Sequence, residues 1–232
     1  MEHCSMEHCV ILISATGEWR AVRKLFPEET CLTSPYGEYF TRLIGRRRGT
    51  FFYGGWGKIA AAASAQYVID RWQPDLLVNL GTCGGFAGHI ERGEIILVDK
   101  TVVYDIYEQM GDFDAHIAHF STQIDLAWLS QPYPTPVRRA LLVSGDRDLL
   151  VEDIPMLKKR YAAIAGDWES GAIAWVAARN GGIRTLILRG VTDLVDSQGS
   201  PAYGDLEYFE SAAFEIMEKL VRSLPDWLEK LA

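Results

Sequence analysis

The 232-residue chain has 48% hydrophobic and 23% charged residues, a composition typical of a globular protein with one large domain. Its formal net charge of −8 excludes a bulk electrostatic attraction to nucleic acid or to an anionic membrane surface. The sequence has no apolar run near the roughly 18 residues of a membrane span, no recognisable signal peptide, and only four cysteines. We therefore expect a cytoplasmic protein without membrane or nucleic-acid partners.

The first nine residues, MEHCSMEHC, contain two His–Cys pairs that repeat at a period of five. Because the segment is terminal and lacks supporting ligands, we interpret residues 1–9 as a mobile tail rather than a metal site. Two further histidines, His116 and His119, stand in DAHIAHF, which we interpret as a polar surface loop. We assign no metal site and no cofactor to this chain.

The remaining elements follow from hydrophobic periodicity. Two alternating segments over 39–53 flank the letters GRRR and predict a hairpin. The segment 106–138 is the least regular and is interpreted as a lid or an oligomer contact. Apolar runs rich in β-branched residues predict buried strands at 10–14, 75–80, 93–105, 139–146 and 184–193. Helical spacing predicts helices at 17–26, 57–72, 162–180 (after a short strand) and from 205 to the end.

Strands that alternate with helices, and that are apolar on both faces, indicate a sheet covered by helices on both sides. No linker rich in Pro, Gly or Ser divides the chain. The predicted fold is therefore a single α/β domain over 10–232, with a central mixed β-sheet flanked by helices on both faces.

Ligands of such sheets bind outside the carboxyl ends of the strands. In LLVNLGTCGGF, residues 76–86, the predicted strand stops at Leu80 and a glycine-rich loop follows. The other strand ends carry two or three carboxylates, one arginine and two hydroxyls, a set suited to a ribose and a proton transfer. These polar ends are 14–16, 81–83, 144–146, 167–169 and 189–193.

Four motifs occur in order along nearly the whole chain from Val10: LVNLGTCGGFAGHIERGEIILVD, VSGDRDL, GDWESGAIAWVA and LRGVTDLVD. Together they resemble the nucleoside phosphorylase/nucleosidase superfamily, and most of all its methylthioadenosine/S-adenosylhomocysteine nucleosidase branch. The resemblance implies hydrolysis of the N-glycosidic bond of a purine nucleoside. It also implies a homodimer or larger homo-oligomer, in which a neighbouring subunit closes the pocket.

The resemblance also implies roles for residues near the sugar and the base. Glu169 would bind the ribose hydroxyls, and Trp168 would pack on the sugar where the nucleosidases usually have Met. Asp193 would protonate N7 of the purine, with Thr192 beside it. A general acid at this point neutralises the departing base.

The resemblance assigns four further residues, two near the attacking water and two on the sugar side of the site. Arg189 would orient the water or the acidic group, and Gly81 and Thr82 would line the sugar side. Glu18 would activate the water, although strict spacing from the first strand would place Trp19 there.

Two departures from the family pattern concern the substrate. Asp148 stands where the nucleosidases commonly have an aromatic residue that stacks on adenine. Leu149 would still offer backbone contacts to the base, and Tyr104 or Tyr107 would be the substitute aromatic. Trp168 is the second departure, and its large side chain narrows the part of the site that holds the sugar.

Three other functions are considered. A phosphorylase of the same fold needs cationic donors for phosphate. The hexameric phosphorylases have an arginine where this chain has Asn79, so that Arg20 would supply half the clamp at best. A futalosine hydrolase tends to have Asn in place of Asp193, and a non-catalytic nucleoside-binding protein would not need the three carboxyls Glu18, Glu169 and Asp193. Three residues also have a purely structural interpretation: helix-dipole stabilisation for Glu169, a turn cap for Asp193, and pairing with a surface carboxylate for Arg189.

Overall fold

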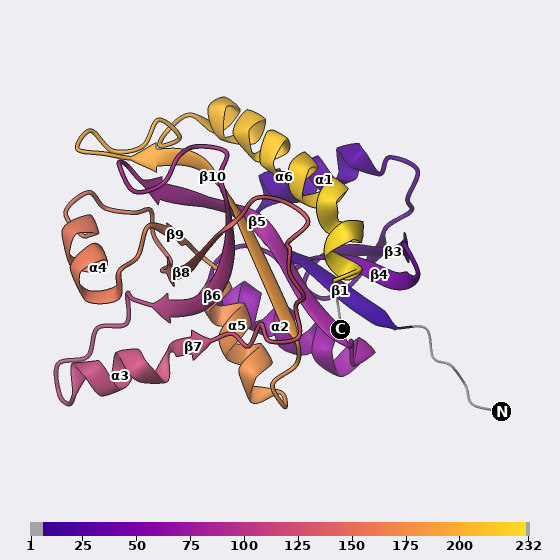
Figure 1. Cartoon of the computed structure of the whole chain (residues 1–232), viewed down its shortest axis with the longest axis horizontal. Helices are drawn as coiled ribbons and strands as arrows, with labels where there is room; N and C mark the ends of the chain where they lie inside the picture. Colours follow the sequence, from indigo (N-terminus) through magenta and orange to yellow (C-terminus); the bar gives the residue numbers. More distant parts are fainter. Residues whose placement is uncertain (1–6, 231–232) are drawn as a thin grey trace.

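The computed structural model describes residues 7–230, which form a mixed sheet with helices on both faces (Figure 1). Two helices pack on each other over one face, α1 (Thr16–Leu25) and α6 (Leu206–Leu228). Two others pair over the opposite face, α2 (Lys58–Trp72) and α5 (Ser170–Arg179). The predicted single α/β fold with helices on both faces is confirmed.

The sheet is closed at one end and open at the other. Strands β10, β6, β8, β9 and β5 pair in a ring, because β10 also pairs with β5, and β1, β4, β3 and β2 extend outward from β5. Strand β7 pairs with β6 outside this path. The strands are β1 (His8–Ile13), β2 (Leu32–Thr33), β3 (Glu38–Ile44), β4 (Arg47–Tyr53), β5 (Leu76–Phe86), β6 (Ile95–Val103), β7 (Ser121–Gln123), β8 (Arg138–Ser144), β9 (Ala165–Asp167) and β10 (Thr185–Val195).

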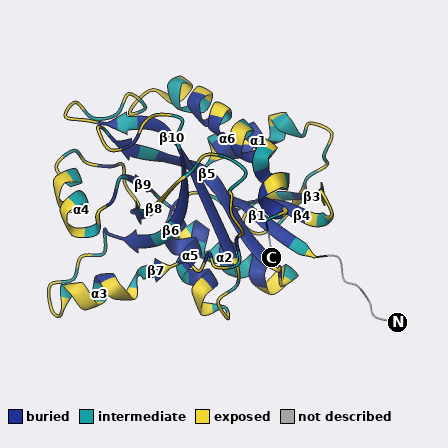
Figure 2. Ribbon diagram, in the orientation of Figure 1, coloured by how far each residue is buried: buried dark blue, intermediate teal, exposed yellow. Residues whose placement is uncertain are grey.

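The central strands are buried on both faces, which explains their continuous apolar runs (Figure 2). Along β5, Val78 belongs to the core under α1 and α6, whereas Leu77 belongs to the core under α2 and α5. Because successive side chains of a strand point to opposite faces, one strand contributes residues to both cores. Polar groups inside these strands, such as Asn79 and Arg189, are fully buried.

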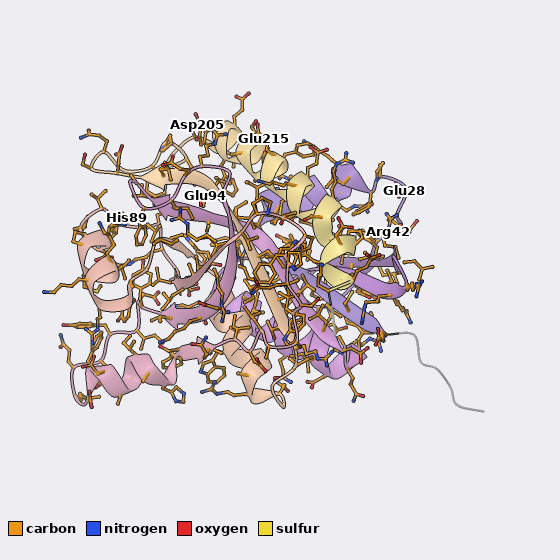
Figure 3. All side chains as sticks on the ribbon, in the orientation of Figure 1. Glu28, Arg42, His89, Glu94, Asp205 and Glu215 are labelled. Atoms are coloured by element: carbon orange, nitrogen blue, oxygen red, sulfur yellow. The ribbon has the colours of Figure 1, made fainter. Side chains whose placement is uncertain are left out.

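The predicted hairpin is confirmed as β3 and β4, which pair antiparallel from Tyr39 opposite Phe52 to Ile44 opposite Arg47. The turn uses Gly45 at φ +59°, in the left-handed region that favours glycine. The outer strands also carry ion pairs to the preceding loop, such as Arg42 with Glu28 at 3.2 Å (Figure 3).

Two predicted boundaries were wrong. The strand beginning at Leu76 does not stop at Leu80 but runs to Phe86, because β10 pairs with β5 over the whole stretch from Thr185 to Val195. The predicted glycine loop is therefore part of the sheet. The first strand begins at His8, inside the predicted tail, since it pairs with β4 from that residue onward. The rest of the predicted tail, residues 1–6, lies outside the described residues.

Two helices also differ from the predictions. The segment interpreted as a polar loop is helix α3 (Phe113–His119), capped by the carboxylate of Asp112. Helix α4 (Ile154–Tyr161) was not predicted. Within residues 7–230, no helix is both long enough and apolar enough to span a membrane.

Candidate active site

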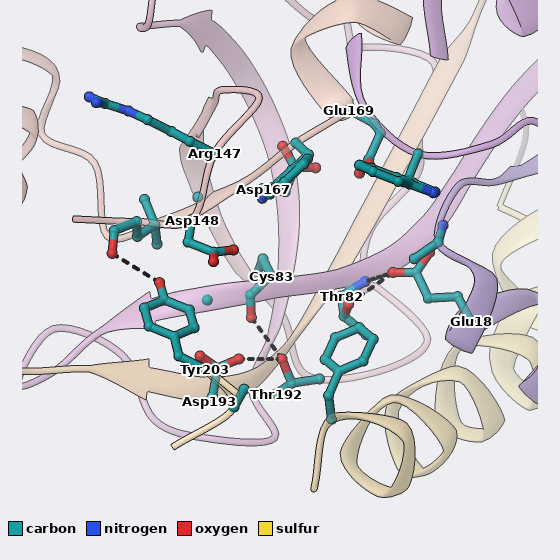
Figure 4. A pocket seen from close by; sticks show the side chains of 18 of the residues that line it. Glu18, Thr82, Cys83, Arg147, Asp148, Asp167, Glu169, Thr192, Asp193 and Tyr203 are labelled. Atoms are coloured by element: carbon teal, nitrogen blue, oxygen red, sulfur yellow. Dashed lines mark hydrogen bonds between the residues drawn. The ribbon is translucent and has the colours of Figure 1, made fainter. Parts of the chain in front are cut away.

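A cavity of about 500 Å³ lies where the carboxyl ends of β1, β8 and β9 meet the middle of β5 and β10 (Figure 4). Its lining includes most of the residues singled out from the sequence: Glu18, Thr82, Leu149, Trp168, Glu169, Thr192 and Asp193. Gly81 and Arg189 lie behind the wall rather than in it. The structure therefore brings residues from distant parts of the chain into one site, as expected for strand ends in an α/β sheet.

Glu18, rather than Trp19, faces the cavity. One carboxylate oxygen of Glu18 accepts hydrogen bonds from Thr82 N at 2.6 Å and Thr82 Oγ1 at 2.9 Å, and the other accepts from Ala15 N at 3.0 Å. Trp19 points into the core and donates to Glu38. Thr82 thus contacts the cavity, but it also fixes the orientation of Glu18.

Gly81 has a different role from the predicted one. A Cβ atom at Gly81 would lie 1.7 Å from Arg189 Nη1 and 2.8 Å from Glu18 Oε1. Glycine is needed there because the guanidinium group passes directly over the strand. Gly81 therefore makes room for Arg189, whereas the prediction had it line the sugar.

Arg189 is fully buried and does not contact the cavity surface. Its Nε lies 2.9 Å from Asp167 Oδ2 and 2.8 Å from Ser170 Oγ, and its Nη2 donates to Asn79 Oδ1 at 2.7 Å. The alternative in which Arg189 pairs with a surface carboxylate is thus wrong, because its partner Asp167 is buried. The charge pairing explains how a guanidinium group is tolerated in the core.

One nitrogen atom of the Arg189 guanidinium group remains to be accounted for. Nη1 has no hydrogen-bond partner among the described residues and lies 3.9 Å from Glu18 Oε1. A buried donor without a partner is costly unless a small polar molecule completes it. The nearby carboxylate of Glu18 therefore compensates the charge of Nη1 without completing a hydrogen bond.

Asp193 lies at an irregularity in β10. The pairing with β5 shifts between Val191 and Asp193, so that Thr192 is an extra residue on β10. A bulge of this kind lets neighbouring side chains turn to the same side, and both Thr192 and Asp193 line the cavity. Thr192 Oγ1 lies 2.6 Å from Asp193 Oδ1, and Ser200 Oγ donates to Asp193 Oδ2.

Glu169 stands just before helix α5 and is 7% exposed. Its Oε1 accepts a hydrogen bond from Gly57 N at 3.0 Å. Burial, followed by the nearby carboxylate of Asp167, raises the pKa of Glu169 to about 8. The group is therefore a hydrogen-bonding carboxyl that gains or loses its charge near neutral pH.

Aromatic side chains surround the remaining part of the cavity. Trp168 meets Trp56 edge to face, with ring centroids 5.7 Å apart. Tyr203 and Phe209 line the wall as well, and Tyr203 donates its hydroxyl to Leu149 O at 2.9 Å. Leu149 contributes to the lining, but its carbonyl is already engaged in that bond.

Asp148 also lines this part of the cavity, and its carboxylate faces inward near Tyr203 (Figure 4). The substitute aromatics named from the sequence were wrong. Tyr104 is buried in a core cluster and Tyr107 is 76% exposed, and neither lines the cavity.

The cavity is strongly acidic. Arg147 is the one basic side chain among its described lining residues. Neither of the two positions considered for phosphate binding places a cation in the cavity. Asn79 is neutral and is buried against Arg189 and Leu12, and Arg20 pairs with Glu210 outside the cavity. The acidic lining residues are Glu18, Asp148, Asp167, Glu169, Asp193 and Asp205.

The described part of the chain has no cluster of three or more His, Cys, Asp or Glu side chains arranged for a metal ion. Cys83 borders the cavity, but its thiol is buried in the core and donates to Gly190 O at 3.7 Å, and burial raises its pKa well above the usual range, which keeps it neutral.

Sequence reasoning missed several contributors. Asp167 was noted at a strand end but given no role, although its position two residues before Glu169 was a usable signal. Ser200 and Tyr203 lie in an irregular segment after β10 with no local pattern to mark them. Gly57 contributes only a backbone N–H, which no side-chain pattern reveals.

Comparison with known proteins decides the family. The sequence profile of the phosphorylase superfamily matches residues 7–224. The chain belongs to this superfamily. The match covers the sheet, the cavity and most of helix α6, so the whole described domain belongs to the phosphorylase superfamily fold.

Relatives within the superfamily are 5'-methylthioadenosine/S-adenosylhomocysteine nucleosidases. The protein from Haemophilus influenzae is 32% identical over 162 residues, which are 64% of this chain and 69% of the relative. The protein from Halalkalibacterium halodurans is 27% identical over 190 residues, 76% of this chain and 80% of the relative.

Solved structures agree in fold. The Helicobacter pylori 5'-methylthioadenosine/S-adenosylhomocysteine nucleosidase with butyl-thio-DADMe-Immucillin-A has a TM-score of 0.78 at 16% identity, covering 96% of this chain and 99% of that one. The Arabidopsis thaliana 5'-methylthioadenosine nucleosidase has a TM-score of 0.76 at 23% identity, covering 94% and 95%. The predicted nucleoside phosphorylase-like fold is thereby confirmed.

Proposed function

We propose that this protein is a nucleosidase that hydrolyses the N-glycosidic bond of a purine nucleoside of the methylthioadenosine/S-adenosylhomocysteine type. The observation that carries the proposal is that Glu18 and Asp193 line one cavity together with the buried carboxyl of Glu169. The nucleosidase names of the relatives support the same reaction.

In the proposed reaction Asp193 acts on the base. As the C1'–N9 bond breaks, its electron pair passes to the purine, and a proton on Asp193 moves to N7. General acid catalysis of this kind typically contributes about 10²–10⁴-fold. Thr192 and Ser200 contact the two oxygens of Asp193 and hold the carboxyl in place.

Glu18 acts on the nucleophile. A water bound to the Glu18 carboxylate on its cavity side would attack C1' and give a proton to Glu18. The products are the free base and a sugar with a hydroxyl at C1'. Arg189, behind the cavity wall, serves here as a positioning residue for Glu18.

Glu169 would bind the ribose hydroxyls and Trp168 would pack on the sugar. The sugar carries positive, oxocarbenium-like charge in the transition state. The surrounding carboxyl groups, of which Glu18 and Glu169 are nearest to the proposed sugar position, favour that charge.

Water is preferred over phosphate as the nucleophile because of the charge of the cavity. A phosphate dianion would have to enter among six acidic side chains with Arg147 as the one cation of the described lining. Arg147 is itself paired with Asp153 and lies against Tyr104. Hydrolysis needs no such anion.

We further propose that the enzyme acts as a homodimer or larger homo-oligomer. Four large apolar residues near the start of α2 and the segment after β6 are strongly exposed: Trp56, Ile59, Tyr107 and Met110. The ion pair between Lys58 and Asp105 brings these two segments together. An exposed apolar group of this kind is typical of an interface. The cytoplasmic location remains a prediction from the sequence.

The test is an incubation with methylthioadenosine, S-adenosylhomocysteine, adenosine and inosine, with and without phosphate, followed by identification of base and sugar. We expect base release in phosphate-free buffer, with the free sugar as the second product. A requirement for phosphate with a sugar 1-phosphate product would establish a phosphorylase instead. Binding without cleavage of any nucleoside would identify a binding protein.

A further inference from the structure

The carboxyl of Glu169 is held from outside its own helix. Its hydrogen-bond donor in the described structure is the N–H of Gly57, at 3.0 Å, immediately before helix α2. Gly57 has φ +84° and, being glycine, no side chain with which to cap the helix. The position of this N–H therefore depends on what holds the first turn of α2.

Two aspartates hold that turn. Asp146 Oδ1 accepts a hydrogen bond from Lys58 N at 2.7 Å and thus caps α2 from the segment after β8. The side chain of Lys58 pairs with Asp105 and lies 3.8 Å from Asp146 Oδ2. Asp105 Oδ2 in turn accepts from Asp146 N at 2.9 Å. The three residues join segments that follow β4, β6 and β8.

The cluster is sheltered enough for its charges to matter. The side chains of Lys58 and Asp105 are 21% and 15% exposed, and that of Asp146 is 38% exposed. Without the ammonium group, Asp105 and Asp146 would face each other as two like charges. We expect the start of α2 to shift in response, because Lys58 N and Gly57 N belong to the same turn.

We propose that Lys58, Asp105 and Asp146 form a clamp that positions Glu169 on the ribose hydroxyls by fixing the N–H of Gly57. The inference rests on the proposed function, since it concerns how Glu169 meets the sugar. None of the three is a catalytic residue, and none lines the cavity; all three act through Gly57.

The experiment is Lys58→Met, which keeps the aliphatic stem and removes the charge. We measure kcat/KM for the best nucleoside from the activity assay and for its 2'-deoxy and 3'-deoxy forms. If the clamp positions Glu169, kcat/KM for the ribonucleoside falls on the order of tenfold. For the form lacking the hydroxyl that Glu169 binds, the loss is about twofold or less, because that contact is already absent.

Three variants control the result. Lys58→Arg keeps a cation and restores most of the ribonucleoside activity. Arg139→Met, which removes the ion pair with Asp99 outside the cavity, leaves the substrate ratio unchanged. Lys58→Met combined with Glu169→Gln is no worse on the ribonucleoside than Glu169→Gln alone, since both act on one contact.

The outcomes separate the two proposals. Equal losses on all three nucleosides, or additive losses in the double variant, would overturn the clamp while leaving the nucleosidase intact. An unmodified enzyme that cleaves no nucleoside would instead overturn the proposed function. If Lys58→Met does not fold, Asp146→Asn keeps the acceptor for Lys58 N and removes one charge; it must then show the same selective loss, in smaller measure.

Discussion

The carboxyl of Asp193 has a hydroxyl beside each of its oxygens, from Thr192 and from Ser200. Such contacts determine where a proton is held and in which direction it is presented. Glu18 is likewise fixed, by two donors from Thr82 and one from Ala15. The candidate site therefore consists of carboxyl groups whose orientation is set by neighbours on other strands.

Asp193→Asn tests the proposed acid. The amide keeps the shape of the side chain but cannot give a proton to N7, so we expect cleavage to fall by about 10²–10⁴-fold with the thermal midpoint nearly unchanged. Initial rates of base release measure the effect. Asp196→Asn is the matched control, because Asp196 accepts a bond from Gln198 N in an exposed turn and should leave the rate unchanged. Near-normal turnover of Asp193→Asn would place the acid elsewhere.

The raised pKa of Glu169 has a consequence for stability. Because burial raises its pKa from 4.5 to about 8, the folded protein keeps a proton that the unfolded chain releases between these values. The stabilising contribution of the protonated group is complete below about pH 4.5 and is lost as pH rises through about 8.

Glu169→Gln should remove this dependence, since glutamine resembles the protonated acid. We expect the difference in thermal midpoint between the variant and the unmodified protein to be larger at pH 8 than at pH 5. Each kcal/mol that the unmodified protein loses between the two pH values should add about 2–4 °C to this difference. Thermal melts at the two pH values measure the difference. Glu152→Gln, at an exposed position, should show no such divergence. Parallel melting curves for Glu169→Gln would argue against a protonated Glu169.

At the scale of elements, β5 and β10 organise the site together. They run parallel over eleven residues each, and the irregularity at Thr192 turns Asp193 into the cavity. Gly81 and Arg189 face each other across this pair. Arg189 on β10 can therefore be buried at this position only because β5 has glycine opposite it.

Gly81→Ala tests that relation. The added Cβ would lie 1.7 Å from the guanidinium of Arg189, which is too close for any small adjustment. We expect a loss of about 1–3 kcal/mol in the free energy of unfolding and a large loss of activity, measured by urea titration and base release. Gly111→Ala, where the new Cβ meets the flexible end of Glu108 at 3.1 Å, should have little effect. Unchanged stability for Gly81→Ala would show that Arg189 can move aside.

At the scale of the whole molecule, the start of α2 and the segment after β6 carry exposed apolar side chains. Ile59 on α2 is 86% exposed and Met110 is 97% exposed, and both flank the clamp residues Lys58 and Asp105. In the proposed oligomer a second copy of the chain covers this surface, which includes Trp56 of the cavity lining. The proposed oligomer and the proposed activity are therefore connected.

Ile59→Asp should weaken the oligomer, because it places a charge at the centre of the apolar group. We expect the molar mass from light scattering to shift toward the monomer at low micromolar concentration, and activity to fall with it. Leu43→Asp is the control, since Leu43 is 62% exposed on β3 and should not alter the mass. A mass unaffected by Ile59→Asp, or already monomeric in the unmodified protein, would contradict the interface.

The sequence by itself determined the α/β class, the hairpin at β3 and β4, and the position of Glu169 after a short strand. Each depends on local periodicity or on an ordered motif, which a sequence carries directly. Only the tertiary structure decided that β5 continues to Phe86, that Gly81 makes room for Arg189, and that Gly57 holds Glu169. These depend on pairing between strands and on contacts between residues more than a hundred positions apart.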